Sequence, residues 1–207
     1  MIFLEPLYDY ALNHLGHVVN HFALIKLLLF ALDKTLLYFL LFAIVRLACL
    51  LLMHRRKSVR HELVLWLFVF YLILLLTLTT FRASYFPWQL IWHWHRDPAE
   101  ISLVFMKETF KLTRGRSLLD FFYNSFGNIL WFIPFGLLLP VLLSQKKHSA
   151  LITCVAGLTT SVLIETLQFF LATGVSDIDD VFFNCCGCLL GVLCARWFFK
   201  RRKFTIR

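Results

Sequence analysis

Four of the chain's 12 Asp and Glu residues lie around the gap between its last two long apolar segments. Glu165 sits within the first of these segments, and Asp177, Asp179 and Asp180 directly precede the second. Carboxylate oxygens are the ligands that divalent cations prefer, and a bound cation could activate water or polarise a phosphoryl group. An acidic run before a helix also stabilises the positive end of the helix dipole. The pattern therefore permits either a divalent cation site or a helix cap.

Amide side chains accompany these carboxylates at what we expect to be one depth in a membrane. Glu165 would lie about 10 Å below the outer boundary, given a rise of about 1.5 Å per helical residue. Polar groups inside a bilayer usually face a bundle interior or a watery cavity. We therefore expect a polar pocket open to the outer face, formed by Asn124, Asn128, Glu165, Gln168, Asp177, Asp179, Asp180 and Asn184. The alternative is that these residues join helices by hydrogen bonds.

Small residues continue below the polar ones at helical spacing. Gly187, Gly191 and Ala195 follow Asp180 on one face of the last apolar segment, and a similar stripe lies below Glu165 in the preceding segment. Small residues let membrane helices approach closely. We expect these two stripes to pack against each other. The expected helix-packing positions are Gly157, Ser161, Gly187, Gly191, Pro134 and Gly136.

Arg46 is the one charged residue between Thr35 and Met53. At about 16 Å below the outer boundary, it could pair with Glu165 or extend toward the inner headgroups. The sequence Cys185-Cys186-x-Cys188 resembles metal-ligand spacing. It lacks a second Cys or His cluster to complete four ligands, so packing is the favoured interpretation and no metal site is assigned to it.

The composition points to a membrane protein. Of 207 residues, 60% are hydrophobic and 16% are charged, against about 25% charged residues in soluble proteins. These values exclude disordered chains, coiled coils and ordinary soluble domains. A helical span needs about 20 mainly apolar residues. Five segments qualify: 35–53, 63–81, 118–143, 149–172 and 181–199. The predicted fold class is all-α, with about five transmembrane helices.

The distribution of Lys and Arg predicts the orientation, because these residues concentrate in cytoplasmic loops. Basic blocks at 54–61, 144–148 and 200–207 are placed inside, and the acidic loop at 173–180 is placed outside. The N-terminus is then outside and the C-terminus inside. The net charge of +9 is explained by these blocks facing anionic headgroups, so nucleic-acid binding is not expected.

Five regions follow from this pattern. Residues 1–32 are expected to form an amphipathic interfacial helix, with a sixth span as the alternative. Residues 33–81 hold two transmembrane helices. Residues 82–116 form an extracellular loop whose Trp and Tyr residues are typical of an aromatic belt and could also stack on a ring-bearing ligand. Residues 117–199 form a three-helix transmembrane core, and residues 200–207 form a basic cytoplasmic tail.

The C-terminal half carries a recognisable set of motifs in a fixed order. They are Asn128-x5-Pro134-x-Gly136, Glu165-x2-Gln168, Asp177-Ile178-Asp179-Asp180 and Asn184-x2-Gly187 with Gly191. In this order and spacing the chain resembles the VanZ-like family of bacterial membrane proteins over residues 117–195.

The resemblance implies a multi-pass protein of the plasma membrane of Gram-positive-type bacteria. The founding role of the family is low-level resistance to teicoplanin, a lipid-tailed glycopeptide that acts outside the membrane. Some members carry an Arg where this chain has Gly174-Val175-Ser176. If that Arg helps bind an anionic group, the role here is lost or falls to Arg82, Arg114 or Arg116.

Three functions are compatible with these observations. The first is a non-enzymatic cell-envelope protein whose pocket binds an amphiphile, such as a lipoglycopeptide or a lipid-linked wall precursor, beside the membrane lipids. The second is an intramembrane enzyme that acts on an envelope lipid with a divalent cation at the Asp run. The third is a small transporter, since a buried Glu is compatible with proton coupling. No cofactor is expected apart from that cation.

Overall fold

The computed structural model describes residues 1–16, 22–53, 58–102, 118–144 and 146–201. The described residues fold into α1 (Glu5–Leu15), α2 (Phe22–Met53), α3 (Val59–Thr79), α5 (Leu118–Leu142), α6 (Ser149–Leu171) and α7 (Ile178–Arg201). Two short 3-10 helices, η1 (Pro87–Gln89) and η2 (Pro98–Glu100), lie between α3 and α5. The described part contains no β-strand, so the predicted all-α fold class is confirmed.

Four of these helices are long and apolar enough to cross a membrane. Their spans are Phe22–Leu52, Val59–Thr79, Ser149–Leu171 and Ile178–Phe198. In α5, the apolar stretch within the described side chains, Phe126–Leu142, is shorter. Helical spans satisfy every backbone hydrogen bond internally, as the apolar interior of a bilayer requires. The chain is a membrane protein.

The N-terminal region differs from the expectation of one amphipathic helix over residues 1–32. Helix α1 ends at Leu15, and α2 begins at Phe22 and continues through the predicted start of the first span to Met53. The physical reason is that residues 22–32 are apolar almost without interruption, so they extend the spanning helix. At 32 residues, α2 is about 48 Å long and exceeds the roughly 30 Å hydrocarbon core of a bilayer.

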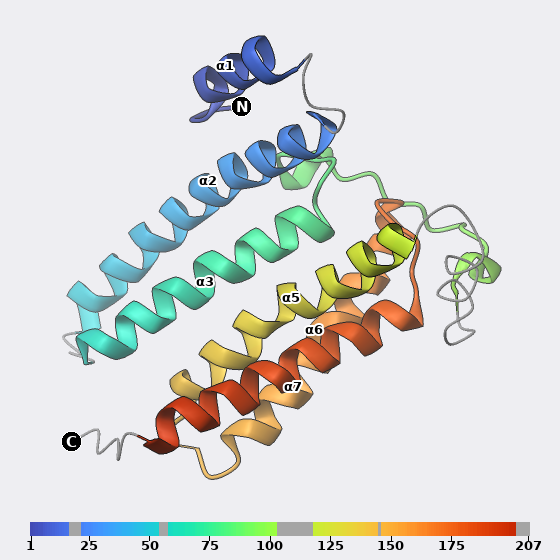
Figure 1. The fold of residues 1–207 in the computed structure, drawn as a ribbon. Coiled ribbons are helices and arrows are strands. Elements are labelled where there is room, and N and C mark those ends of the chain that lie inside the picture. The colour runs from blue at the N-terminus through green and yellow to red at the C-terminus, as the bar shows by residue number, and fades with distance from the viewer. Residues whose placement is uncertain (17–21, 54–57, 103–117, 145, 202–207) are drawn as a thin grey trace.

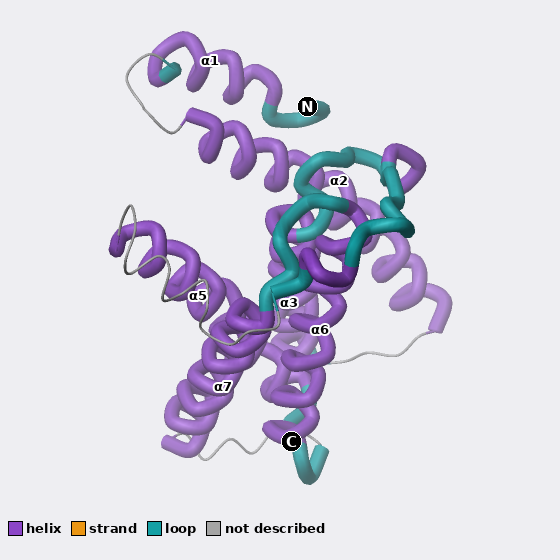
Figure 2. Tube along the Cα trace, turned by 90° about the vertical axis from the view of Figure 1, so that its right-hand side faces the viewer, coloured by secondary structure: helices purple, strands orange, loops and turns teal. Residues whose placement is uncertain are grey.

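The helices form one bundle with alternating directions (Figure 1). Helices α3 and α6 end where α5 and α7 begin, and we call this the Asp180 end. The opposite end, where the α5–α6 connection lies, is called the Lys146 end. Figure 2 shows the segment 80–102 running over the Asp180 end, near the last turns of α3 and α6. Helices α5, α6 and α7 pack together, and the α2–α3 hairpin joins them through contacts of α3 with α5 and α6.

The glycine stripe of α7 packs against α5. A Cβ atom added at Gly187 would lie 2.1 Å from the Ile129 carbonyl oxygen, and one at Gly191 would lie 2.2 Å from that of Ile133. On the α5 side, Gly136 lies equally close to α7, because a Cβ atom added there would be 1.9 Å from the Cys188 carbonyl oxygen. The two backbones therefore meet without intervening side chains, as small residues in membrane helices allow.

The expected pairing of this stripe with the small residues of α6 is thus wrong for its two glycines. Helix α6 meets α7 on another face, where a Cβ at Gly157 would lie 2.6 Å from the Cys188 Sγ atom. Successive α7 residues point in directions about 100° apart, so Gly187 and Cys188 serve different neighbours. Sequence spacing identifies the stripe but not which of two adjacent helices it contacts.

Arg46 was considered as a partner of Glu165 or of the inner headgroups, and in the structure it pairs with Glu62 instead. Arg46 Nε donates to Glu62 Oε2 at 3.0 Å and Arg46 Nη2 to Glu62 Oε1 at 2.5 Å. The cause is topological: α2 and α3 are antiparallel, so both residues lie near the Lys146 end, whereas Glu165 lies at the Asp180 end. A bidentate pair also satisfies the guanidinium better than distant headgroups would.

We predict that Gly187→Ala lowers the free energy of unfolding by about 1–3 kcal/mol, because α5 and α7 must separate to admit the methyl group. Gly127→Ala is the matched control in α5, since no atom lies within 4 Å of a Cβ there. The control should raise stability by about 0.5–1 kcal/mol through lower backbone entropy. Unfolding of the purified chain by sodium dodecyl sulfate in mixed micelles measures both values. Equal effects at the two positions would contradict the packing.

Candidate functional site

The carboxylates at the start of α7 organise the turn that enters the helix. Asp177 precedes the helix, and its Oδ1 accepts the Asp179 backbone N–H at 3.0 Å. Glu165 of α6 in turn accepts the Asp177 backbone N–H at 3.1 Å. A side-chain oxygen that receives the first amide groups of a helix is a standard N-cap and complements the helix dipole. Asp177 therefore serves as a cap of α7 in this structure, and Glu165 holds Asp177 in place.

Two further polar side chains join α7 to its neighbours. Asn128 Nδ2 of α5 donates to Asp180 Oδ1 at 2.6 Å. Asn184 Nδ2 of α7 donates to Ser161 Oγ of α6 at 2.9 Å, and both of these groups are buried. Hydrogen bonds of this kind hold membrane helices together. These contacts correspond to the alternative in which polar residues connect helices.

Gln168 connects α6 to α3 rather than lining an open space. Its Nε2 donates to the Thr79 carbonyl oxygen at 3.2 Å, at the last turn of α3. Gly174 lies close against its side chain, since a Cβ there would be 3.3 Å from the Gln168 Cδ atom. The Asn124 side chain lies outside the described residues. The structure thus brings seven of the eight predicted residues to one end of the bundle and engages them largely with each other.

Within the described residues, no three His, Cys, Asp or Glu side chains are grouped so that they could hold a metal ion. The carboxylate of Asp177 is directed to the amide group of Asp179, and that of Asp180 receives the Asn128 amide. A cation would have to displace these donors. The geometry gives the divalent cation hypothesis no additional support.

Arg96 holds the segment 80–102 on the Asp180 end. Its Nη1 donates to the Phe169 carbonyl oxygen at 2.8 Å, and its guanidinium lies 4.9 Å from the centroid of the Phe169 ring. The His93 backbone N–H donates to the Phe170 carbonyl oxygen at 2.8 Å. Both contacts are made to carbonyl groups in the last turn of α6, and the Phe169 oxygen also accepts the Ala172 backbone N–H at 3.3 Å. Arg96 is not one of the three arginines expected from the sequence as possible anion-binding replacements, which are Arg82, Arg114 and Arg116, and the last two lie outside the described residues.

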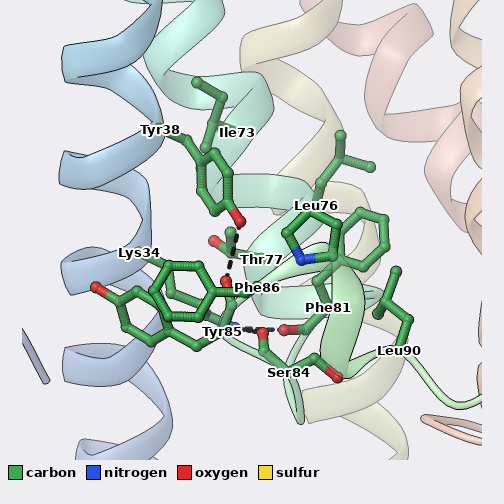
Figure 3. Close-up of a pocket in the computed structure, with 11 residues that line it drawn as sticks. Lys34, Tyr38, Ile73, Leu76, Thr77, Phe81, Ser84, Tyr85, Phe86 and Leu90 are labelled. Carbon is green, nitrogen blue, oxygen red and sulfur yellow. Dashed lines mark hydrogen bonds between the residues drawn. The ribbon is translucent and has the colours of Figure 1, made fainter.

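A cavity of about 420 Å³ lies at the same end between α2, α3 and the segment that follows α3 (Figure 3). Most of its lining atoms belong to apolar side chains, and its size is within the usual range of small-molecule sites. This cavity was not predicted from the sequence. The lining residues are Lys34, Tyr38, Ile73, Leu76, Thr77, Phe81, Ser84, Tyr85, Phe86, Pro87 and Leu90.

Lys34 is the one cationic residue that lines this cavity, and it is 1% exposed. Its Nζ donates to the carbonyl oxygens of Phe81 and, at 3.1 Å, Ser84. It also lies 4.5 Å from the centroid of the Phe30 ring. Among the described side chains, no carboxylate forms an ion pair with Lys34. Among the described residues, the buried Lys34 ammonium group is contacted by neutral groups, namely two carbonyl oxygens and an aromatic ring.

Asp33, the neighbouring residue, is fully buried and has its own set of donors. Its carboxylate accepts the backbone N–H groups of Ile2, Phe3 and Leu4 at 2.7–2.8 Å and the Tyr85 hydroxyl at 2.6 Å. Burial and the Asp33 carboxylate raise the pKa of Tyr85 above its ordinary value, so its hydroxyl remains a donor. Asp33 therefore ties the entry of α1 and the segment after α3 to α2.

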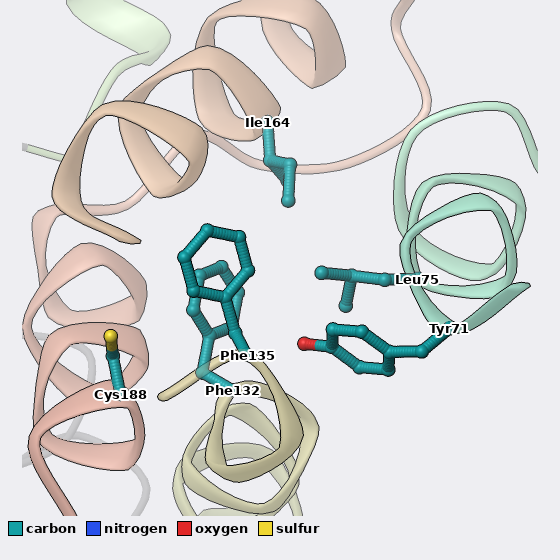
Figure 4. Close-up of a cluster of buried hydrophobic side chains, with 6 residues drawn as sticks. All are labelled: Tyr71, Leu75, Phe132, Phe135, Ile164 and Cys188. Atoms are coloured by element: carbon teal, nitrogen blue, oxygen red, sulfur yellow. The ribbon is translucent and has the colours of Figure 1, made fainter. Parts of the chain in front are cut away.

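The α3 wall of the cavity is supported from its other side by the buried core (Figure 4). Tyr71 and Leu75 of α3 face Phe132 and Phe135 of α5 in this cluster, with Ile164 of α6 between the helices. The Tyr71 hydroxyl donates to the Trp131 carbonyl oxygen at 2.6 Å. Ile73 of the same helix lines the cavity, and Leu76 both lines the cavity and packs against this cluster. The core therefore fixes the position of this wall.

We predict that Asn128→Asp destabilises the fold, because it removes the amide donor and sets two carboxylates against each other. The loss should be about 1–3 kcal/mol in the free energy of unfolding. The double variant N128D/D180N should recover most of it, since the amide at position 180 can donate to the carboxylate at position 128. Mixed-micelle unfolding measures both variants. A double variant no more stable than N128D would show that this contact does not join α5 to α7.

Comparison with known proteins relates the chain to one family. The model of the VanZ/LLP1 family matches residues 68–199, which begin within α3 and include all of α5 and α6. Protein VanZ of Enterococcus faecium is 39% identical over 71 residues, a match that covers 34% of this chain and 43% of that protein. No solved structure matches. The family match covers more than half of the chain and begins well before the C-terminal motifs. The chain accordingly belongs to the VanZ/LLP1 family.

Proposed function

We propose that this chain is a multi-pass protein of the bacterial plasma membrane that binds an amphiphile of the cell envelope at its Asp180 end. We further propose that this end faces outward and that binding there limits the action of a lipid-tailed glycopeptide of the teicoplanin type. The family membership supports the envelope setting, and the cavity between α2 and α3 is the observation that carries the binding proposal.

The charge distribution supports this orientation. Lys146 and Lys147 lie between α5 and α6 at the Lys146 end, and at the same end α3 begins beside Arg60 and α7 ends at Arg201. Loops rich in Lys and Arg favour the cytoplasm. The Asp180 end then faces outward, with Trp92 and Trp94 stacked at 5.2 Å in the segment above it. Indole rings favour the headgroup layer, where such a segment would lie.

The shape and chemistry of the cavity suit an amphiphile. The segment 81–90 forms one wall of the cavity, and the α3 wall reaches Ile73, about 9 Å below the end of α3 at Thr79. That depth extends from the headgroup layer into the first part of the hydrocarbon region. Apolar atoms dominate the lining, while the polar groups of Lys34 and Ser84 lie where the segment closes over α2. A lipid tail and a polar head would each meet matching surroundings.

A resistance assay tests this function. Expression of the chain in a susceptible Gram-positive host should raise the inhibitory concentration of teicoplanin several-fold, with little effect on a glycopeptide that lacks a lipid tail. Ile73→Trp should abolish the increase, because the indole would occupy the cavity. Leu67→Trp, on the same helix at a position that is 56% exposed and outside the cavity, is the matched control and should retain it.

Membrane levels of each variant are compared by immunoblot, so that loss of activity is separated from loss of protein. Equal protection by the Ile73 and Leu67 variants at equal membrane levels would refute the role of the cavity. Failure of the unaltered chain to protect at all would refute the resistance role.

A further inference from the structure

We infer that Lys34 makes the cavity selective for amphiphiles with an anionic head, such as a phosphate ester. The inference rests on the proposed function and adds the class of ligand to it. In this arrangement the head would lie beside the Lys34 ammonium group, and the tail would extend along Ile73 and Leu76 of α3.

The surroundings of Lys34 leave its charge available. An ammonium group has three donors, and Lys34 directs donors to two backbone carbonyl oxygens, those of Phe81 and Ser84. Carbonyl groups and the Phe30 ring stabilise a cation but do not neutralise it. A buried charge without a counter-ion is costly, and an anionic ligand would remove that cost.

Asp33 does not supply the missing counter-ion, although it is the adjacent residue. Its carboxylate already receives four donors, from Ile2, Phe3, Leu4 and the Tyr85 hydroxyl. Successive residues on a helix point about 100° apart, so the two side chains serve different partners. The Tyr38 hydroxyl is likewise engaged, because it donates to the Tyr85 carbonyl oxygen at 3.0 Å. Lys34 is therefore the cavity residue best placed to meet an anion.

The proposed selectivity belongs to a part of the chain that the family match does not cover. Lys34 and Tyr38 lie in α2, before residue 68, whereas Ile73, Leu76 and Leu90 lie within the matched range. The apolar wall is thus built from the shared region, and the cation comes from outside it. We therefore assign the head-group preference to α2 of this chain.

The test uses the purified full-length chain in dodecyl maltoside micelles and compares amphiphiles of one chain length. Thermal unfolding midpoints are recorded against increasing dodecyl phosphate, dodecanol and dodecyltrimethylammonium, with inorganic phosphate as the head alone. Dodecyl phosphate should bind at least about tenfold more tightly than dodecanol, the ratio expected for a hydrogen bond to a charged group. The cationic amphiphile should bind most weakly, and inorganic phosphate should not shift the midpoint.

Substitutions then locate the charge. Lys34→Met should reduce dodecyl phosphate binding to the level of dodecanol. Lys26→Met is the matched control, because Lys26 is an exposed lysine of the same helix that does not line the cavity. If Lys34→Met fails to fold, the comparison of anionic, neutral and cationic amphiphiles on the unaltered chain still decides the question.

The outcomes separate this inference from the function on which it rests. Equal affinities for the three dodecyl compounds, each weakened by Ile73→Trp, would overturn the anion preference and leave amphiphile binding in place. Absence of any binding that Ile73→Trp weakens would overturn amphiphile binding at this cavity itself. An anion preference that persists in Lys34→Met and is lost in Lys26→Met would place the selectivity elsewhere.

Discussion

Two adjacent charges, Asp33 and Lys34, are buried inside a largely apolar helix, and the α2–α3 half of the Asp180 end is built around satisfying them. A charge removed from water costs several kcal/mol unless hydrogen bonds or counter-ions compensate it. The Asp33 carboxylate accepts hydrogen bonds from the backbone that leads into α1 and from the Tyr85 hydroxyl. The Lys34 ammonium group donates hydrogen bonds to the carbonyl oxygens of Phe81 and Ser84. The segment after α3 is thereby folded over α2, and the cavity lies beneath it.

The other half of the same end is held by different means. The backbones of α5 and α7 meet at glycines, and hydrogen bonds from Asn128 and Asn184 fix α7 against α5 and α6. Gln168 joins the two halves, because it donates to the Thr79 carbonyl oxygen at the end of α3. The polar residues of the family motifs thus frame the bundle, while the described cavity lies beside them in the α2–α3 hairpin. The helices that carry the family motifs and the cavity are therefore adjacent but distinct parts of the structure.

Composition and apolar segments were sufficient to predict an all-α membrane protein, and the motif pattern was sufficient to predict the family. Helical spacing also placed Glu165, Asp180 and Asn184 at one end. The partner of a charged side chain on a neighbouring helix was harder to predict. Arg46 pairs with Glu62 because α2 and α3 are antiparallel in this register, and spacing within one helix does not encode that register.

The cavity was missed for a related reason. The first span was predicted to cover residues 35–53, directly after Asp33 and Lys34. In the structure the helix continues through both residues, because Ile2, Phe3, Leu4 and the segment around Tyr85 satisfy them from distant parts of the chain. Two adjacent charged residues, Asp33 and Lys34, within the largely apolar stretch from Phe22 to Met53 were the signal that could have located the site.

A cryo-EM structure of the full chain in phosphatidylcholine nanodiscs with dodecyl phosphate would test anionic amphiphile binding most directly. We expect density for the phosphate within hydrogen-bond distance of Lys34 Nζ and density for the alkyl chain along Ile73 and Leu76. Density for the ligand among Glu165, Asp180 and Asn184 instead, or a cavity filled by the chain's own side chains, would contradict the assignment.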